Sequence, residues 1–325
     1  MSAQYEDHHA ALERAAKAID SADRVTLLCH VNPDGDALGS VLAMHHALRA
    51  AGRESLASFP SPFAVAPHYR DLPGLDLLTP PGELGTGSEV VVTFDCGAVG
   101  RLGDLAPVAE TAGELIVVDH HVSNERYGTI NVIDPGAAAS GVVVRELIRV
   151  LGLPVTRDVA FCLYVALVCD TGRFQYETTT PEVFALAGEL LEFDLPVSSL
   201  SRTLFEEHSF AYLALLGESL AGMTLVRDQS FVWTAVTQEQ LQRHGVTMDE
   251  VEGLIDIVRR TAEADVACVL KEDADGAVRV SLRSVGATDV QRIAAAHGGG
   301  GHRFAAGFTS DVGIDDTVAR IRASL

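Results

Sequence analysis

The chain has 325 residues, of which 47% are hydrophobic, and its mean hydropathy is +0.19. A chain of this length usually forms more than one core, so we expect two domains, and the apolar content excludes a disordered or fibrous protein. The 24 basic and 45 acidic residues give a net charge of −21, which opposes the binding of long duplex nucleic acid at the general surface.

The sequence also favours a reduced, cytoplasmic setting. No run reaches the ~18 to 20 uninterrupted apolar residues of a membrane span, and residues 1–10 are polar and acidic, unlike a secretory signal. The five cysteines are odd in number and lack Cys-x-x-Cys spacing, which indicates core thiols, not a disulfide framework or a zinc site. We therefore expect a cytoplasmic protein.

The first predicted elements are an amphipathic helix over residues 5–21 and a buried strand over residues 25–29. His30, Asp34 and Asp36 follow this strand in a segment that Pro33 and Gly35 keep from being helical, and a helix is predicted over residues 37–51. The polar loop therefore lies at the carboxyl end of a strand, where open α/β sheets hold their active sites. Its carboxylates and imidazole suit a hard divalent cation such as Mn²⁺ or Mg²⁺.

Taken alone, this loop could equally be an Asx-rich turn that caps a helix. Three further apolar segments, however, also end in acidic residues or histidines. They are residues 90–94 before Asp95, residues 115–118 before Asp119, His120 and His121, and the helical residues 161–169 before Asp170. The repetition favours a metal site. The neighbouring pair His45 and His46 lies within the helix predicted over residues 37–51. We expect these two side chains to be packed or exposed at the surface and not to form a second metal site.

The near-continuous apolar runs at residues 90–94 and 115–118 are typical of a parallel sheet covered on both faces by helices. Their alternation with helical patterns predicts the α/β class. Two further strands are predicted in this half, over residues 56–59 and 130–133. A loop region is predicted over residues 60–87, and a helix over residues 141–151. Ser140 precedes this last helix and is a candidate either for substrate binding or for the N-cap.

After helices predicted over residues 182–193 and 198–221, the pattern becomes rich in strands. The predicted strands are 223–226, 231–236, 266–271 and 278–283, with Asp275-Gly276 as a turn signal before the last. We therefore expect a parallel-sheet domain over residues 1–190, a helical connector over 191–221 and a smaller α/β domain over 222–325.

A run of four glycines, residues 298–301, precedes His302 near the end of the chain. Residues without Cβ let backbone N–H groups converge on an anion, and Arg283 and His302 can add directed donors. A plain loop is the alternative, but the combination favours a phosphate or nucleotide pocket. The residues predicted for this pocket are Arg283, Ser284, Gly299, Gly300, Gly301 and His302.

The spacing of His30, Asp34 and Asp36, followed by Asp95, by Asp119-His120-His121 and by Asp170, resembles the four metal-binding motifs of the DHH phosphoesterase superfamily. Residues 298–307 resemble the glycine-rich signature of the DHHA1 substrate-binding domain. By size and order, the chain is similar to the NrnA-like branch. Members of that branch act on very short oligoribonucleotides, on 3′-phosphoadenosine 5′-phosphate (pAp), or on cyclic di-AMP and its linear product pApA.

The resemblance implies two divalent cations, Mn²⁺ first, with Mg²⁺ or Co²⁺ as alternatives. The implied ligands are His30 and Asp34 for one ion, Asp36, His120 and Asp170 for the other, and Asp95 for both. Two such ions activate a water and shield the phosphate charge that repels a nucleophile. Asp95 and His121 are the implied catalytic residues, since His121 is left free of metal to bond a phosphate oxygen or to protonate the leaving group. Asp119 would orient a ligand, and Ser140 would contact substrate.

We therefore expect a dinuclear-metal phosphodiesterase that hydrolyses cyclic di-AMP, pApA or RNA of a few nucleotides to mononucleotides, and that removes the 3′-phosphate of pAp. Expected partners are these small nucleotides and a second copy in a homodimer, with no long duplex nucleic acid and no membrane. The alternatives are a non-catalytic nucleotide sensor, a RecJ-like single-strand exonuclease and a family II-like pyrophosphatase. The complete ligand set argues against the sensor.

Overall fold

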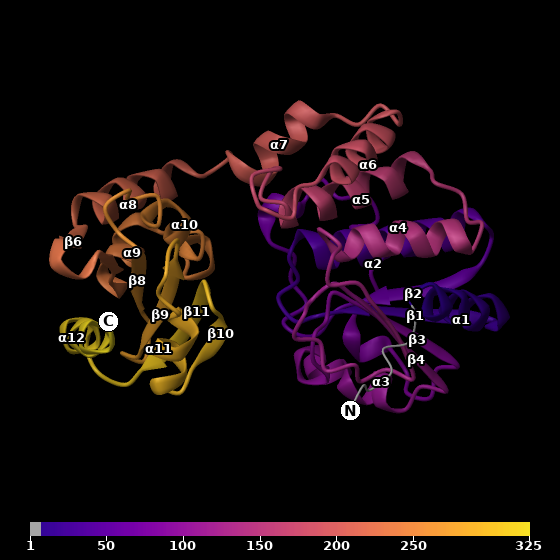
Figure 1. The fold of residues 1–325 in the computed structure, drawn as a ribbon, viewed down its shortest axis with the longest axis horizontal. Coiled ribbons are helices and arrows are strands. Elements are labelled where there is room, and N and C mark those ends of the chain that lie inside the picture. The colour runs from indigo at the N-terminus through magenta and orange to yellow at the C-terminus, as the bar shows by residue number, and fades with distance from the viewer. Residues whose placement is uncertain (1–7) are drawn as a thin grey trace. The chain divides into compact units, whose positions relative to one another are not determined.

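The computed structural model describes residues 8–325, which form two compact units that divide after Glu207 (Figure 1). We call them the N-terminal and the C-terminal unit. The helix predicted over residues 5–21 is α1 (His8–Ser21), and residues 5–7 lie outside the described range. Leu12, Ala16 and Ile19 on α1 are buried, as its amphipathic pattern predicts.

The N-terminal unit is built on a five-stranded parallel sheet in the order β2-β1-β3-β4-β5. The strands are β1 (Arg24–Cys29), β2 (Glu54–Ser58), β3 (Val90–Phe94), β4 (Glu114–Asp119) and β5 (Ile130–Ile133). Every residue of β3 is buried, because both faces of the sheet are covered. The predicted α/β class with a parallel sheet is confirmed.

Successive strand residues pack into different layers, as the two-residue period of a strand requires. Leu27 and Val92 belong to the large core under the helices α1, α2, α4 and α5, whereas Leu28 and Val91 pack with the helices η4 and α3 on the other face (Figure 1). The bounds of these helices are α2 (Gly35–Ala50), α3 (Ala106–Glu110), α4 (Ser140–Val150), α5 (Arg157–Asp170) and η4 (Val99–Leu105).

The segment predicted as loop, residues 60–87, contains three short 3₁₀ helices. They are η1 (Pro67–Tyr69), η2 (Leu75–Leu77) and η3 (Pro81–Glu83). Two of them begin with proline, whose fixed φ suits a first helical position. The helix η1 brings the buried ring of Tyr69 against Gly35, at the start of α2.

The helices α2 and α5 pack closely where α2 carries a glycine. A Cβ added to Gly39 would lie 2.5 Å from the carbonyl oxygen of Cys162 and 3.0 Å from the backbone N of Ala166. Asp36 lies in the first turn of α2 and Asp170 is the last residue of α5. The contact at Gly39 therefore sets the spacing of two proposed metal ligands.

We expect Gly39→Ala to lower the free energy of unfolding by about 1 to 3 kcal/mol, because the added methyl group meets backbone atoms that have no room to move. Thermal and urea unfolding measure this change. Gly188→Ala is the matched control, since Gly188 is exposed on a helix and a Cβ there would have nothing within 4 Å, so this change should be neutral or slightly stabilising. Equal stability of Gly39→Ala and the wild type would contradict the close contact.

The helix predicted over residues 198–221 is wrong as a single element. The chain forms α6 (Pro181–Leu191), α7 (Val197–Phe205) and α8 (Phe210–Ala221), with a break between the last two. The backbone N–H groups of Glu206 and Glu207 bond to the carbonyl of Arg202 and end α7, and the Ser209 hydroxyl accepts from the Tyr212 N–H and starts α8. The division between the two units falls inside this break.

The C-terminal unit contains a six-stranded mixed sheet in the order β10-β11-β9-β8-β7-β6. The strands are β6 (Thr224–Val226), β7 (Phe231–Val236), β8 (Val266–Glu272), β9 (Val278–Ser284), β10 (Gly300–His302) and β11 (Ala305–Ser310). The first four match the predicted strands, and Gly276 turns the β8–β9 hairpin with φ 86°. The glycine run is partly a strand, which the sequence did not predict, because Gly300 and Gly301 pair with β11.

Helices cover both faces of this second sheet. The helices α11 (Val290–Ala296) and α12 (Ile314–Ser324) supply one apolar core, while α8, α9 (Gln238–His244) and α10 (Leu254–Val258) supply the other. Two single 3₁₀ turns, η5 (Arg227–Gln229) and η6 (Asp249–Val251), complete the unit. Among the helices of the described residues, none is long and apolar enough to cross a membrane.

Candidate metal centre

The proposed ligands gather where the strands of the N-terminal unit end. His30 follows β1, Asp95 follows β3 and Asp119 is the last residue of β4. Because the strands are parallel and adjacent, their carboxyl ends meet at one edge of the sheet. Asp34 is the N-cap of α2, with its side chain accepting from the N–H groups of Asp36 and Ala37, so it lies on the same edge.

Three groups of side chains at this edge have the spacing of metal ligands. In each group, one donor atom per residue lies within 4.8 Å of all the others. The groups are His30, Asp34 and Asp95; Asp36, His120 and Asp170; and Asp95, Asp119, His120 and His121. The structure thus brings together all six predicted metal ligands and both predicted catalytic residues.

The two carboxylate oxygens of Asp95 face different groups. Its Oδ2 lies 3.5 Å from His30 Nε2, whereas its Oδ1 lies 3.7 Å from His120 Nε2. His120 Nε2 in turn lies 3.4 Å from Asp170 Oδ2 and 3.9 Å from Asp36 Oδ2. Asp95 also has a left-handed backbone, φ 54°, which is uncommon outside glycine and concentrates at functional sites. This carboxylate can therefore serve two ions.

Backbone carbonyls fix the orientation of two histidines. His30 Nδ1 donates to the carbonyl of Val31 at 2.8 Å, and His120 Nδ1 donates to the carbonyl of Ala137 at 3.1 Å. Because a backbone carbonyl engages Nδ1, Nε2 is the atom of each ring that faces the carboxylates and is available to bind a cation. The donor set of carboxylate oxygens and imidazole nitrogens fits a hard divalent cation.

Burial and mutual repulsion dominate the electrostatics of the carboxylates. Burial, followed by the charges of Asp95 and Asp170, raises the pKa of Asp36. Burial also raises the pKa of Asp170 to about 6, against the opposing effect of His120. Burial alone would raise the pKa of Asp95 as well, but the hydrogen bond with His30 and the charges of the neighbouring histidines hold it below its usual value. Cations at this cluster would relieve the repulsion.

His121 is held differently from the other two histidines. Its Nδ1 donates to Asp119 Oδ1 at 2.7 Å, and this bond raises the pKa of His121 to about 9. Asp119 is fully buried and also accepts from Asn124 Nδ2 at 2.5 Å. Asn124 bonds the carbonyl of Cys96 too, so it ties Asp119 to the end of β3. Sequence reasoning missed Asn124, and the only signal for it was an amide three residues after a histidine pair.

Two further contacts had no clear signal in the sequence. The backbone N–H groups of Ser140 and Gly141 hold both oxygens of Asp36, at 2.6 and 2.9 Å. The ring of Tyr69 packs against Gly35 in the ligand loop, and burial raises the pKa of its hydroxyl. Tyr69 comes from a proline-rich segment without periodicity, so its place could not be predicted.

The histidine pair on α2 is packed and lies apart from the proposed ligands. His45 is buried with its Nδ1 2.8 Å from Ser55 Oγ, and burial lowers its pKa to about 4. His46 Nε2 donates to the carbonyl of Pro73 at 3.0 Å. Neither ring belongs to a group with metal-ligand spacing among the described residues, in agreement with the prediction for this pair.

In the C-terminal unit, the predicted substrate residues lie on neighbouring strands. Ala305 of β11 pairs with Arg283 of β9 on one side and with His302 of β10 on the other. The Arg283 side chain is 30% exposed and its Nε lies 4.0 Å from Asp256 Oδ1. The Ser284 hydroxyl is buried and donates to Asp265 Oδ1 at 3.0 Å. The side chain of His302 lies outside what the structure describes.

The glycines of this segment differ in what requires them. A Cβ on Gly299 would lie 2.2 Å from the carbonyl oxygen of Gly307, and one on Gly301, whose φ is 136°, would lie 2.5 Å from that of Ala305. These two glycines are explained by the close approach of β11. Gly300 has nothing within 4 Å of its Cβ position, so it leaves open space where a ligand could approach the backbone.

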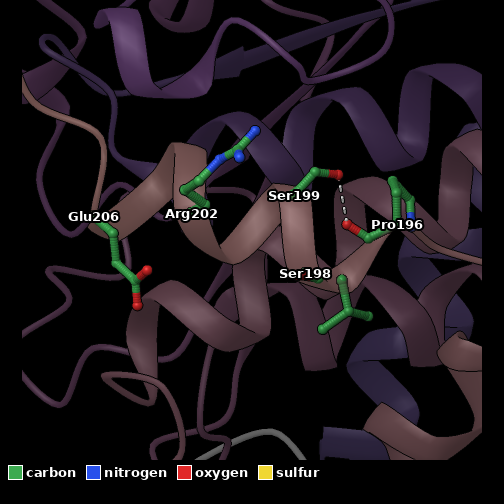
Figure 2. A pocket seen from close by; sticks show the side chains of 6 residues that line it. Pro196, Ser198, Ser199, Arg202 and Glu206 are labelled. Carbon is green, nitrogen blue, oxygen red and sulfur yellow. Dashed lines mark hydrogen bonds between the residues drawn. The ribbon is translucent and has the colours of Figure 1, made fainter.

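A separate hollow of about 550 Å³ lies on α7 (Figure 2). Its lining residues are Pro196, Val197, Ser198, Ser199, Arg202 and Glu206. The Ser199 hydroxyl donates to the Pro196 carbonyl at 3.0 Å, while the side chains of Arg202 and Glu206 point apart (Figure 2). None of the lining residues belongs to the groups with metal-ligand spacing, so this hollow adds nothing to the candidate centre.

Comparison with known proteins gives matches along most of the chain. Residues 24–167 match the DHH family, N-terminal domain, and residues 228–324 match the DHHA1 domain. A protein from Thermus thermophilus named bifunctional oligoribonuclease and PAP phosphatase NrnA is 32% identical over 300 residues, which are 91% of this chain and 87% of that protein.

Two solved structures share the fold. The crystal structure of an exopolyphosphatase-related protein from Bacteroides fragilis is 25% identical with a TM-score of 0.92, covering 97% of this chain and 95% of that one. The crystal structure of exonuclease RecJ bound to manganese is 15% identical with a TM-score of 0.58, covering 97% and 94%. At that identity, the second likeness concerns the fold alone.

Proposed function

Because this chain belongs to the DHH family and carries a DHHA1 domain, we propose that it hydrolyses short oligoribonucleotides and removes the 3′-phosphate of pAp, with two divalent cations. The chain is a metal-dependent phosphoesterase, as the sequence predicts. The predicted resemblance to the NrnA-like branch is confirmed by relatives at 26–32% identity over most of the chain.

The observation that carries the proposal is the position of Asp95 between two groups of ligands, with one oxygen toward each. We assign His30 and Asp34 to one cation, and Asp36, His120 and Asp170 to the other. When bound, such ions would lower the pKa of a water molecule, so that its hydroxide form can attack phosphorus, and would supply charge that offsets the phosphate oxygens. The chain's part is to hold these oxygen and nitrogen donors at one edge of a rigid sheet.

His121 is the proposed proton donor to the leaving oxygen. Asp119 accepts from its Nδ1, which directs Nε2 away from Asp119 and leaves that atom to carry the transferred proton. Asn124 and the backbone N–H of His120 also donate to Asp119 and hold the carboxylate in place. Asp119 therefore orients the histidine and stabilises its charged form, without itself contacting substrate.

For the substrate, we propose a dinucleotide-sized molecule whose far phosphate is captured by the C-terminal unit. Arg283 offers a partly exposed guanidinium, and His302 lies two strands away at the same level of the sheet, with Gly300 on the same strand at the level of Ser281. The net charge of −21 disfavours long strands at the general surface. Cyclic di-AMP and pApA fit the same description and are included in the proposal.

The alternative functions are weaker. A non-catalytic sensor has no need of six metal ligands with ligand spacing, which this chain retains. The RecJ likeness extends to the fold only. A family II-like pyrophosphatase would lack the DHHA1 domain that residues 228–324 match.

We further propose Mn²⁺ as the working ion, since the donors are mostly oxygens with two imidazoles. We also propose that the protein forms a homodimer and is located in the cytoplasm. The free thiols of all five cysteines support a reducing compartment. Sedimentation of the purified protein tests the dimer directly.

A substrate panel tests the function. We expect Mn²⁺-dependent release of mononucleotides from RNA of a few nucleotides and from pApA, and release of phosphate from pAp, with little activity on pyrophosphate. Chelation with EDTA should remove all these activities. A protein that binds pApA or pAp tightly but turns none of the panel over would identify a sensor, and one that prefers pyrophosphate would overturn the substrate assignment.

A further inference from the structure

The N-terminus of α4 reaches into the proposed metal centre. Ser140 is the first residue of this helix, and its Oγ donates to Asp95 Oδ1 at 2.9 Å. Its backbone N–H donates to Asp36 Oδ2 at 2.6 Å, and the next N–H, that of Gly141, donates to Asp36 Oδ1 at 2.9 Å. One turn of helix therefore holds two of the proposed ligands.

The burial of Ser140 and its place in α4 argue against the two roles that its sequence position suggests, substrate binding and helix capping. The residue has 0% exposure, and its hydroxyl proton is directed at a carboxylate inside the protein. The N-cap of α4 is Ala139, one residue earlier, so Ser140 does not cap the helix. The distance from its Oγ to Asp119 Oδ1 is 3.4 Å, longer than that to Asp95, and the single hydroxyl proton favours Asp95.

These contacts are asymmetric with respect to the two groups of ligands. The Oδ1 atom of Asp95 that Ser140 bonds is the one that faces His120. Asp36, which the backbone of Ser140 holds, belongs to the same group as His120 and Asp170. Within the described residues, the side-chain carboxylates that Ser140 bonds are those of Asp36, Asp95 and Asp119. Its contact with Asp95 is therefore on the Oδ1 side, whereas Oδ2 faces His30, which is grouped with Asp34.

We propose that Ser140 is a positioning residue for one of the two cations only, the ion assigned to Asp36, His120 and Asp170, and that it acts by orienting Asp95 Oδ1 and Asp36 together. The inference rests on the proposed dinuclear function. In this proposal, Ser140 contacts the metal ligands, whereas the sequence suggested a contact with substrate.

The physical reason is preorganisation. Asp36, Asp95 and Asp170 repel one another, and a carboxylate that is free to rotate would turn its oxygens apart. The donors at the start of α4 hold the oxygens in one orientation, and the positive end of the helix dipole offsets part of their charge. Loss of a hydrogen bond to a metal-ligating carboxylate typically lowers metal affinity about 10- to 100-fold.

The experiment measures Mn²⁺ affinity by calorimetry on the full-length protein, with no substrate. We expect two binding events for the wild type, and in Ser140→Ala one event weakened about 10- to 100-fold with the other unchanged. Ser58→Ala is the matched control, because Ser58 is also fully buried but lies at the end of β2 outside the proposed ligands, and it should bind both ions as the wild type does.

Two ligand variants assign the affected ion. In Asp34→Ala, the remaining ion is the one held by Asp36, His120 and Asp170, and adding Ser140→Ala should weaken it by the same factor. In Asp170→Ala, the remaining ion lies on the His30 side, and adding Ser140→Ala should change its affinity less than about twofold. Thermal unfolding of each metal-free variant sets a common temperature at which all of them are folded.

The outcomes separate this inference from the proposed function. A wild type that binds fewer than two Mn²⁺ ions refutes the dinuclear centre itself. A wild type that binds two ions, with Ser140→Ala unchanged, refutes the positioning role while leaving the function intact. Equal weakening of both ions would also overturn the inference, because it would mark a general packing effect.

Discussion

Replacing Asp95 with alanine is expected to abolish hydrolysis, by at least about a thousand-fold in kcat, and to remove more bound metal than any other single ligand change. Among the described residues, Asp95 is the one carboxylate whose two oxygens face both groups of ligands. Without Asp95, the group of His30 and Asp34 would lose one ligand. The group of Asp36, His120 and Asp170 would lose one as well. Charge stabilisation by the ions, which is worth several kcal/mol, would be lost with them.

Metal analysis and turnover of pApA by the same samples measure both parts of this expectation. Asp34→Ala and Asp170→Ala are informative companions, because each removes a ligand from one group only and should retain about one ion. Asp104→Ala should behave as the wild type, since Asp104 is exposed and bonds Ser61 away from the centre. Two full equivalents of metal in Asp95→Ala would refute the bridging role.

Arg283→Ala is expected to lower kcat/KM on pApA about ten- to hundred-fold without reducing metal content. A charge-assisted contact with a phosphate is worth about 1.5 to 3 kcal/mol, which sets this range. Metal content should be unaffected because every proposed ligand belongs to the N-terminal unit. The loss can fall on KM or on kcat, depending on whether the contact strengthens in the transition state.

The control for Arg283 is on the same strand. Arg279 faces the same side of β9, is exposed and pairs with Asp273, so Arg279→Ala should change kcat/KM less than about twofold. A generic ester such as bis-p-nitrophenyl phosphate has no second phosphate, and Arg283→Ala should hydrolyse it at nearly the wild-type rate. Equal losses on pApA and on this ester, with metal intact, would show that Arg283 does not capture substrate.

The positions that could be predicted from the sequence are those where a strand of high apolar content ends in a charged residue. Asp95 and Asp119 follow such strands, and parallel pairing then brings their side chains to one edge. The α/β class follows from the same runs. The grouping of His30 with Asp95 rests on the family resemblance as well, because spacing along the chain does not show which strands are neighbours.

What could not be predicted depends on contacts between distant segments. Tyr69 reaches Gly35 from a segment without periodicity, and Ser140 meets Asp36 across 104 positions of sequence. The break between α7 and α8 was missed because residues 198–221 keep a helical apolar pattern, and only the cap at Ser209 marks the interruption. The strand β11 was missed because small residues and glycines in its first half gave no alternating apolar pattern.

All proposed metal ligands fall between His30 and Asp170, within the unit that ends at Glu207, and the residues proposed to bind the substrate's far phosphate fall in the other unit. In evolutionary terms, mutations that change which nucleotide is recognised can accumulate in the C-terminal unit while the ion-binding residues are inherited intact. The same separation makes the chain suited to recombination: exchanging residues 208–325 for the equivalent part of a relative should transfer substrate preference and leave ion stoichiometry as it was.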